Sequence, residues 1–486
     1  MTPLYSVAEI RDIERAAAAG LPAGVLMERA GRAAADCALA MLAGSTVLVL
    51  AGPGNNGGDA LEAAANLALA GIDVSVLYLA GTGELAPETA HALKRARDGD
   101  AVFIDELPAH CDLVLDGLFG IGLARALTGA ARELALAVNR LGVAVLALDV
   151  PSGLDADTGA VIGPDGVAIR ATRTITFIGD KPGLHTYSGR DHAGVVTVAS
   201  LEIAALPLAS AGINDPSCFA AQLTPRSHNS HKGSFGDVAI VGGAAGMTGA
   251  AVLAARGALF AGAGRVFVAS LDPGPAYDSM QPEIMFRSAA AFNGAASTLV
   301  LGPGMGDSAA AIRALVKALD GPSPLVLDAD ALNLIAASPD LQGHLSSRAA
   351  DTIMTPHPLE AARLLGVTAG VVQGDRLAAA REIAARFGAV VVLKGSGSVI
   401  ADARGMAVIN PTGNPGLATG GTGDLLAGVC GSLLAQGWPA WEAALGAVWM
   451  HGAAADWLVQ QGVGPVGMTA GELPAAVRTV FNQLLG

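Results

Sequence analysis

A run of glycine and threonine at 419–423 leads directly into Asp424 and then into an apolar stretch that predicts a helix. A glycine-rich turn of this kind leaves free backbone N–H groups at the helix N-terminus, where they bind anions such as phosphate. Asp424 would lie beside a bound phosphate, where it is suited to removing the proton from an attacking hydroxyl group. The plainer alternative is that Asp424 only caps the helix, but the many glycines and threonines of the segment favour the chemical role.

A second glycine-rich segment, "GPGNNGGDA" at 52–60, lies between a predicted strand at 46–52 and a predicted helix at 60–71. Its glycines match the G-x-G-x-x-G pattern of dinucleotide-binding domains. A dehydrogenase site would also need an acidic residue at the end of the next strand, and the stretch 74–79 ends without one. Pro53 removes a backbone donor from the loop as well. The sequence therefore argues against hydride transfer.

Three polar loops, at 52–60, 116–129 and 149–159, each follow a predicted strand. In an open α/β sheet, ligands bind beyond the carboxyl ends of the strands. Taken alone, the asparagines fit turn chemistry and Asp59 fits an acid at a helix start, but three such loops in one domain favour a pocket. Its polar groups would be Asn55, Asn56, Asp59, Asp116, Asp149 and Ser152.

Apolar stretches alternate with helical patterns along both halves of the chain, which predicts mainly parallel sheets with helices on both faces. The predicted fold class is therefore α/β, with two three-layer α/β/α domains. We expect the domains at 1–212 and 226–486, joined by an aperiodic linker at 213–225. The first forty residues predict two helices, and the tail from Asp424, which holds all four tryptophans, is mostly helical. The expected strands are 46–52, 74–81, 113–120, 143–153, 174–183, 237–243, 264–270, 298–306, 324–332, 352–358 and 390–401.

Composition narrows the class of protein. Hydrophobic residues make up 52% of the 486 residues and charged residues 15%, which suits large buried cores, and the net charge of -14 argues against a nucleic-acid partner. The N-terminus lacks the apolar segment of a signal peptide, and the most apolar zone, 425–441, is interrupted by several glycines and Pro439, so we expect no membrane span. The cysteines form no C-x-x-C pair, which fits a reduced cytoplasm. They are Cys37, Cys111, Cys218 and Cys430.

The segments "GPGNNGGDA", "LDGLFGIGL" (115–123) and "LDVPSGLDADTG" (148–159) resemble the NAD(P)HX epimerase family, also called the YjeF N-terminal domain, over residues 1–210. This resemblance implies a Rossmann-like domain that interconverts the R and S hydrates of NADH and NADPH, with Asp149 moving a proton. It implies potassium ligands at Asn56, Asp116 and Ser152. Ala60 departs from the family pattern, where we expect glycine. The residues that the resemblance places at the substrate are Asn55, Asn56, Gly57, Gly58, Asp59, Gly120, Ile121, Gly122, Leu123, Ala124, Arg125, Ala126 and Asp149.

The C-terminal half resembles ribokinase-like kinases in its G-x-G-D motif, and the ADP-dependent NAD(P)H-hydrate dehydratase family over residues 222–486. The motifs are "LGPGMG" (301–306), "LDADALN" (327–333), "TPHPLEAARLLG" (355–366) and "VLKGSGSVI" (392–400). The resemblance implies phosphoryl transfer from ADP, accompanied by Mg²⁺, to the hydrate hydroxyl, followed by elimination that releases AMP and phosphate. It places Ala250, Gly306, His357 and Asp424 at the hydrate, and Lys394, Gly395, Ser396, Gly397, Ser398 and Gly423 at the nucleotide. The plainer alternatives are a loop or helix-cap role for His357 and a solvated Lys394.

Together the two resemblances predict a bifunctional repair enzyme for NADHX and NADPHX, cytoplasmic and homo-oligomeric, without a nucleic-acid or membrane partner. One alternative is a kinase of a small hydroxylated compound, such as a vitamin precursor, with an N-terminal binding or scaffold module. Such modules include RNA-associated ones, which the acidic charge disfavours. Accumulation of a phosphorylated product would favour the kinase, whereas release of phosphate with restored reduced-cofactor absorbance would favour the dehydratase.

Overall fold

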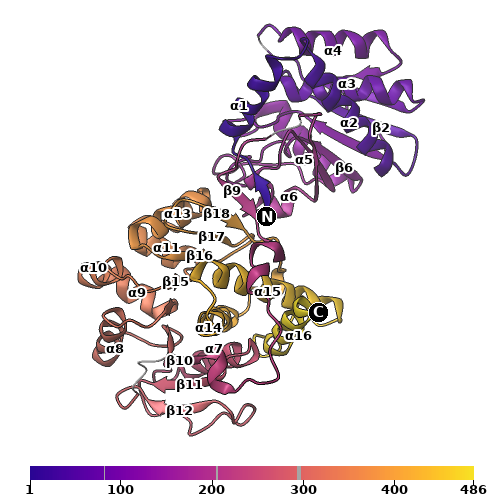
Figure 1. Ribbon diagram of the computed structural model, residues 1–486. Coiled ribbons are helices and arrows are strands. Elements are labelled where there is room, and N and C mark those ends of the chain that lie inside the picture. Colours follow the sequence, from indigo (N-terminus) through magenta and orange to yellow (C-terminus); the bar gives the residue numbers. More distant parts are fainter. Residues whose placement is uncertain (82, 204–205, 293–296) are drawn as a thin grey trace. The chain divides into compact units, whose positions relative to one another are not determined.

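The chain forms two compact units, Pro3–Ala211 and Gly212–Gly486, and Met1–Thr2 belong to the second (Figure 1). Both units contain a mainly parallel sheet with helices packed against it, which confirms the predicted α/β class. The computed structural model describes residues 1–81, 83–203, 206–292 and 297–486.

The N-terminal unit is built on a seven-stranded sheet in the order β4-β3-β2-β5-β6-β7-β8, and all neighbouring strands are parallel. The expected strands are present, and two further short strands, β4 and β8, form the edges of the sheet. Both are apolar in sequence but partly exposed. The strands are β2 (Thr46–Ala51), β3 (Asp73–Tyr78), β4 (Val102–Ile104), β5 (Leu113–Gly117), β6 (Ala144–Leu148), β7 (Arg173–Phe177) and β8 (Val195–Ala199).

Helices cover both faces of this sheet because successive strand side chains point to opposite sides. Val47 and Val49 of β2 pack in the core under α1–α4, while Leu48 and Leu50 pack under α5. The two helices expected in the first forty residues are α1 and α2. The helices are α1 (Val7–Ala18), α2 (Val25–Met41), α3 (Asn55–Leu69), α4 (Pro87–Asp98), α5 (Gly129–Leu141) and the short α6 (Gly189–His192).

The order of this sheet reverses between β2 and β5. From β2 the chain passes through α3 to β3 and β4, and it then returns to place β5 on the other side of β2. The loops that follow β2 and β5 therefore diverge at the carboxyl end of the sheet, which is where open α/β sheets bind ligands.

The sheet of the C-terminal unit has the order β1-β9-β18-β17-β16-β15-β14-β13-β10-β11-β12, and its two strands at one end, β1 and β9, each include residues from both sides of the division of the chain. The strands from β12 to β16 are parallel, whereas β17 pairs antiparallel with both β16 and β18. The stretch 390–401, expected as one strand, is a hairpin whose loop is 394–398. The strands are β1 (Thr2–Leu4), β9 (Ala211–Ile213), β10 (Asp237–Gly242), β11 (Arg265–Ser270), β12 (Met285–Ser288), β13 (Thr298–Leu301), β14 (Leu325–Leu327), β15 (Thr352–Met354), β16 (Val390–Leu393), β17 (Val399–Ala401) and β18 (Ala407–Ile409).

One face of this sheet packs against α7, α14, α15 and α16, and the four tryptophans lie there. The remaining helices, α8–α13, form a second layer, in which α13 contacts β16, β17 and β18 (Figure 1). The helices are α7 (Thr248–Phe260), α8 (Ala309–Leu319), α9 (Ala329–Ala337), α10 (Pro339–Ser346), α11 (Pro358–Leu365), α12 (Ala369–Gly374), α13 (Arg376–Phe387), α14 (Thr422–Ala435), α15 (Ala440–Gln460) and α16 (Leu473–Leu485).

Residues 213–225, which the sequence predicts as a linker, fall within the C-terminal unit. Phe219 is 1% exposed, and its ring centroid lies 6.2 Å from those of both Trp438 and Trp449. Pro216 begins a short 3-10 turn, Pro216–Cys218, and Phe219 follows this turn directly and is buried in the core. The segment 213–225 is therefore packed although its sequence has no periodic apolar pattern.

The most apolar zone of the sequence, 425–441, forms most of α14 and the start of α15, both of which pack on the sheet. Within the described ranges, no helix combines the length and apolar character needed to cross a membrane. All four cysteines are free thiols.

Helices α7 and α14 cross with their backbones in contact. A Cβ atom on Gly428 would lie 1.9 Å from the carbonyl oxygen of Ala254, and one on Gly257 would lie 2.4 Å from that of Leu425. Only glycine provides the required space, so this crossing fixes the position of α14 and of Asp424 in its first turn.

We expect Gly428→Ala to lower the free energy of unfolding of the C-terminal unit by about 1–3 kcal/mol, because the added methyl group forces two packed backbones apart. Gly343 in α10 is the matched control, since nothing lies within 4 Å of the Cβ position there. Gly343→Ala should be neutral or stabilising by up to about 1 kcal/mol. Urea unfolding followed by circular dichroism measures both, and equal midpoints would contradict the close crossing.

Candidate functional site

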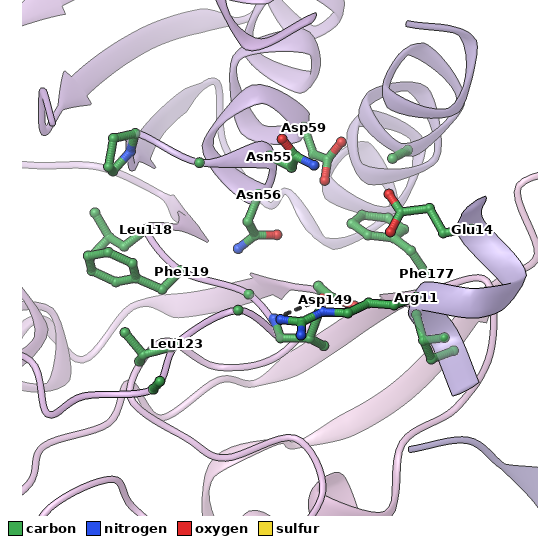
Figure 2. A pocket seen from close by; sticks show the side chains of 18 of the residues that line it. Arg11, Glu14, Asn55, Asn56, Asp59, Leu118, Phe119, Leu123, Asp149 and Phe177 are labelled. Carbon is green, nitrogen blue, oxygen red and sulfur yellow. Dashed lines mark hydrogen bonds between the residues drawn. The ribbon is translucent and has the colours of Figure 1, made fainter. Parts of the chain in front are cut away.

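The N-terminal unit contains a cavity of about 860 Å³ at the carboxyl ends of β2, β5 and β6 (Figure 2). Pockets of roughly 300–1,000 Å³ are typical of small-molecule and cofactor sites. The three polar loops meet here, and α1 adds a wall that the sequence did not predict. Gly57 and Gly58, predicted at the substrate, are buried in the first turns of α3 and do not line the cavity. The predicted substrate residues that line it are Asn55, Asn56, Asp59, Gly120, Ile121, Gly122, Leu123, Ala124, Arg125, Ala126 and Asp149.

Asp116 and Ser152 are fully buried and join the loop after β5 to the loop after β6. The Ser152 hydroxyl donates to Asp116 Oδ1 at 2.6 Å, and the Ser152 backbone N–H donates to Oδ2 at 2.8 Å. The Phe119 N–H donates to the Ser152 oxygen at 2.9 Å. Burial raises the pKa of Asp116 to about 6, although the hydrogen bonds from Ser152 act in the opposite direction. The pair holds the loop that begins at Leu118 against β6.

Asn56 is 8% exposed, and within the described part of the chain neither its Oδ1 nor its Nδ2 has a hydrogen-bond partner. Buried side-chain amides are rarely left unpaired, so this amide is available to a ligand. With Asp116 and Ser152 it offers amide, carboxylate and hydroxyl oxygens, the donor types that hard cations take. These donors fit potassium. Across the described ranges, no group of three or more histidine, cysteine, aspartate or glutamate side chains forms a metal-binding cluster.

Asp149 is paired with a lysine that lies entirely inside the protein. Lys181 is 0% exposed, and its Nζ lies 2.7 Å from Asp149 Oδ1. The same ammonium donates to Thr176 Oγ1 at 2.7 Å and to the Phe177 carbonyl at 2.9 Å. A buried charge is tolerated when it is paired and hydrogen-bonded. The Ile121 N–H donates to the other Asp149 oxygen at 3.3 Å, so one carboxylate connects Lys181 to the cavity loop.

Two further carboxyl groups, Asp59 on α3 and Glu14 on α1, face the same cavity (Figure 2). Burial raises the pKa of Asp59 well above its usual value, and the charges of Asp149 and Glu14 add to the effect. Burial and Asp149 also raise the pKa of Glu14. Because α3 begins at Asn55, Asp59 lies beyond its first turn, and the helix-start alternative does not describe it.

Space, more than backbone conformation, requires glycine in the turn between β2 and α3. A Cβ on Gly52 would lie 1.8 Å from the Leu118 carbonyl oxygen, and one on Gly57 would lie 1.8 Å from the Gly52 carbonyl oxygen. Ala60 fits because it faces Gly117, where a Cβ would lie 2.3 Å from the Ala60 methyl group. The alanine thus occupies space that Gly117 leaves free.

In the C-terminal unit, Asp424 is the third residue of α14, which follows Gly421 in a left-handed conformation. Asp424 is therefore not the helix cap. Burial raises its pKa to about 6, the charge of Asp328 adds to this, and Lys394 opposes it. A carboxylate with a pKa near neutrality is suited to general-base catalysis.

Lys394 lies against the first turn of α14. Its Nζ is 2.6 Å from Asp328 Oδ1 and 4.0 Å from Glu360 Oε2, and a Cβ on Gly423 would lie 3.3 Å from it. Burial opposes the charge of Lys394, but Asp328 and Glu360 outweigh it and hold its pKa above the usual value. Lys394 is paired and half-hidden, so the solvated-lysine alternative does not describe it.

His357 is the N-cap of α11. Its Nδ1 accepts from the N–H groups of Leu359 at 3.1 Å and Glu360 at 3.4 Å, and Glu360 in turn accepts from the His357 N–H at 2.8 Å. Burial and the charge of Lys394 lower the pKa of His357. The helix-cap alternative is thus correct for the imidazole, and a contact with the hydrate stays a prediction.

Ala250 lies in the first turn of α7, which follows the loop after β10, and Gly306 lies in the loop after β13. The two loops are adjacent, since the Ala244 N–H donates to the Gly304 carbonyl at 2.7 Å. The Gly306 N–H donates to Asp330 Oδ2 at 2.8 Å. The strand order reverses between β10 and β13, so these loops lie at a second switch point.

The predicted nucleotide loop, 394–398, joins β16 to β17. The buried side chain of Arg376 is hydrogen-bonded to the start of this loop. This guanidinium is 1% exposed and donates to the carbonyls of Leu393 at 3.1 Å and Lys394 at 3.3 Å. A Cβ on Gly395 would lie 2.9 Å from Arg376, and the Gly395 N–H donates to Ser398 Oγ at 3.2 Å. These hydrogen bonds therefore hold the hairpin loop 394–398 in one conformation.

Several residues that shape the two sites were not predicted. In the N-terminal unit they are Lys181, Arg11 and Glu14. In the C-terminal unit they are Asp328, Glu360 and Arg376. Asp328 and Glu360 lie inside the motifs "LDADALN" and "TPHPLE", so these motifs could have identified them as site residues. No pattern in the sequence indicates that Lys181 pairs with Asp149.

Comparisons with known proteins match the two halves of the chain separately, and the division between the two units falls between the matched ranges. A family model described as YjeF-related protein N-terminus matches residues 23–183, and one described as NAD(P)H-hydrate dehydratase matches 238–477. Bifunctional NAD(P)H-hydrate repair enzymes of Coxiella burnetii and Escherichia coli K12 are 38% and 37% identical, over 99% and 98% of this chain and 100% and 93% of theirs. A solved ribokinase-like superfamily protein of Enterococcus faecalis is 28% identical, covers 58% of this chain and 99% of its own, and has a TM-score of 0.50.

The chain belongs to the family of bifunctional NAD(P)H-hydrate repair enzymes. It therefore has NAD(P)H-hydrate epimerase and dehydratase activities, as the sequence predicted. The alternative of a vitamin-precursor kinase with a scaffold module does not explain relatives that match both halves along their whole length.

We expect Lys181→Met to lower the midpoint of thermal unfolding of the N-terminal unit and to cost about 3–5 kcal/mol, because it leaves Asp149 without its buried partner. Adding Asp149→Asn should recover part of that loss, since both charges are then removed. Differential scanning calorimetry of the two variants measures this coupling. A single Lys181→Met change that leaves the midpoint unaltered would contradict the buried pair.

Proposed function

We propose that the cavity of the N-terminal unit interconverts the R and S hydrates of NADH and NADPH, and that the first turn of α14 dehydrates the S form at the expense of ADP. The observation that carries the first assignment is the unpaired Asn56 amide beside the Asp149 carboxylate. Both side chains lie against Gly120, where a Cβ would be 3.0 Å from Asp149 Oδ2 and 3.2 Å from Asn56 Cγ.

Epimerisation requires the hydroxyl-bearing ring carbon to lose and regain its configuration. Asp149 takes the proton of the hydroxyl group, the bond from that carbon to the ring nitrogen opens, and the nitrogen takes up a proton. Rotation about the neighbouring carbon–carbon bond and closure on the other face give the second epimer. Lys181 holds Asp149 in place for both directions of this proton transfer.

Potassium would be held by Asn56, Asp116 and Ser152. When bound, it supplies a fixed positive charge at the substrate amide or hydroxyl oxygen. The Asp116–Ser152 hydrogen bonds keep two of these donors in position, and the unpaired amide of Asn56 completes the set.

Dehydration begins at Asp424, which removes the proton of the hydrate hydroxyl group. The hydroxyl oxygen attacks the terminal phosphorus of ADP, the bond to AMP breaks, and a phosphorylated hydrate forms. Loss of phosphate, with a proton from the adjacent ring carbon, restores the double bond of NAD(P)H. The N–H groups at the start of α14 and the Lys394 ammonium receive the phosphate charge, and Mg²⁺ accompanies the nucleotide.

The roles of Ala250, Gly306 and His357 at the hydrate, and of 395–398 and Gly423 at ADP, are part of this proposal. So are the cytoplasmic location and the homo-oligomeric state. The loops after β10 and β13, the hairpin 394–398 and the start of α14 all lie beyond the carboxyl ends of strands or at a helix N-terminus, which supports a common site.

We expect Asp424→Asn to abolish dehydration and to leave epimerisation unchanged, and Asp149→Asn to do the reverse. The rate of the affected step should fall about 10³-fold or more, because the substitution removes the carboxylate that takes up the proton. Dehydration is followed by reduced-cofactor absorbance, and epimerisation by chromatographic separation of the R and S hydrates. Loss of both activities from either single change, with the fold preserved, would overturn the two-site proposal.

The dehydratase should lose activity in mild acid. Asp424 acts as a base only when ionised, and its pKa is about 6, so kcat/KM for the S hydrate should fall about tenfold per pH unit below that value. The pKa of Glu360 is also raised to about 6, chiefly by burial, so Glu360→Gln is the necessary control. The acid limb should persist in Glu360→Gln, and its disappearance there would assign it to Glu360.

A further inference from the structure

Three carboxyl groups, Asp59, Glu14 and Asp149, line the N-terminal cavity, and the cationic residues that line it, within the described ranges, are Arg11 and Arg125. Lys181 lies beneath Asp149 and does not line the cavity. A dinucleotide hydrate carries negatively charged phosphates, so the two arginines are the lining residues suited to bind that part of it.

Arg11 reaches from α1 to the loop that carries Arg125. Its Nη2 lies 4.0 Å from the Cβ position of Gly122, in the middle of the loop 120–126. The guanidinium is exposed, and its charge interacts with that of Glu14, which lies three residues along the same helix and also lines the cavity. Figure 2 shows Arg11 extending from α1 over the cavity. A guanidinium at a cavity is well suited to bidentate binding of phosphate oxygens.

We propose that Arg11, together with Arg125, binds the pyrophosphate of the dinucleotide hydrate in the N-terminal cavity. This inference rests on the proposed epimerase function of that cavity. The hydrated ring, which is uncharged, lies toward Asn56 and Asp149, and the phosphates lie toward the two arginines.

The test uses the full-length protein with Arg11→Ala and, as a matched control, Arg15→Ala. Arg15 is on the same helix, one turn further along, and pairs with Asp12 at the surface. With NADHX, Arg11→Ala should raise the KM for epimerisation about tenfold and change kcat less than about twofold, the effect of one lost charged contact. Arg11→Lys should restore part of the loss, and Arg15→Ala should match the wild type.

A phosphate-free substrate, the hydrate of dihydronicotinamide riboside, separates phosphate binding from ring binding. Wild type and Arg11→Ala should have equal kcat/KM with it. An equal loss with both substrates, or an unchanged KM for NADHX in Arg11→Ala, would overturn the assignment of Arg11. Failure of the wild type to epimerise either substrate would overturn the epimerase proposal itself. Dehydration of the S hydrate, at the other unit, should be unchanged in every variant and reports that the fold is intact.

Discussion

Both functional helices are held by contact between one backbone and another, and only glycine permits that contact. In the N-terminal unit Gly57 of α3 packs on the Gly52 carbonyl, and in the C-terminal unit Gly428 of α14 packs on the carbonyl of Ala254. The helix then has little freedom to shift, because any larger side chain would meet backbone and not a movable side chain. The groups that begin these helices, Asn56 in α3 and Asp424 in α14, therefore have fixed positions at the ends of the sheets.

The two sites use the same electrostatic arrangement on different folds. In each, one carboxylate pairs with a lysine: Asp149 with the buried Lys181, and Asp328 with the partly buried Lys394. In each, a nearby carboxyl group has its pKa raised, chiefly by burial: Asp59 in one and Asp424 in the other. Neighbouring acids with different proton affinities can accept and hold protons at the same pH. Repair of a hydrated cofactor needs such proton transfers at both steps.

Local patterns predicted much of this fold. The buried strands are continuous apolar stretches, and the polar loops that follow them were placed correctly at one edge of the N-terminal sheet. The G-x-G-D turn before α14 and the two N-terminal helices are likewise visible in the sequence. These features depend on residues close together in the chain, so periodicity and composition suffice to find them.

The features that were missed depend on contacts between distant residues. Lys181 meets Asp149, and Arg11 meets the loop at Gly122, only after the sheet has formed. The segment 213–225 looked like a linker because the burial of Phe219 depends on Trp438 and Trp449, more than 200 residues away. Gly57 and Gly58, which the resemblance placed at the substrate, are buried in α3, and their contact with the substrate stays a prediction.

The proposed function requires one chain to carry two sites that act in succession on the two epimers. Incubating the wild-type protein with a mixture of R and S NADHX and excess ADP, while following reduced-cofactor absorbance, tests this requirement. Absorbance should rise until the whole mixture is converted, because the N-terminal site supplies S hydrate as the C-terminal site consumes it. A lasting plateau at the initial S fraction would contradict it.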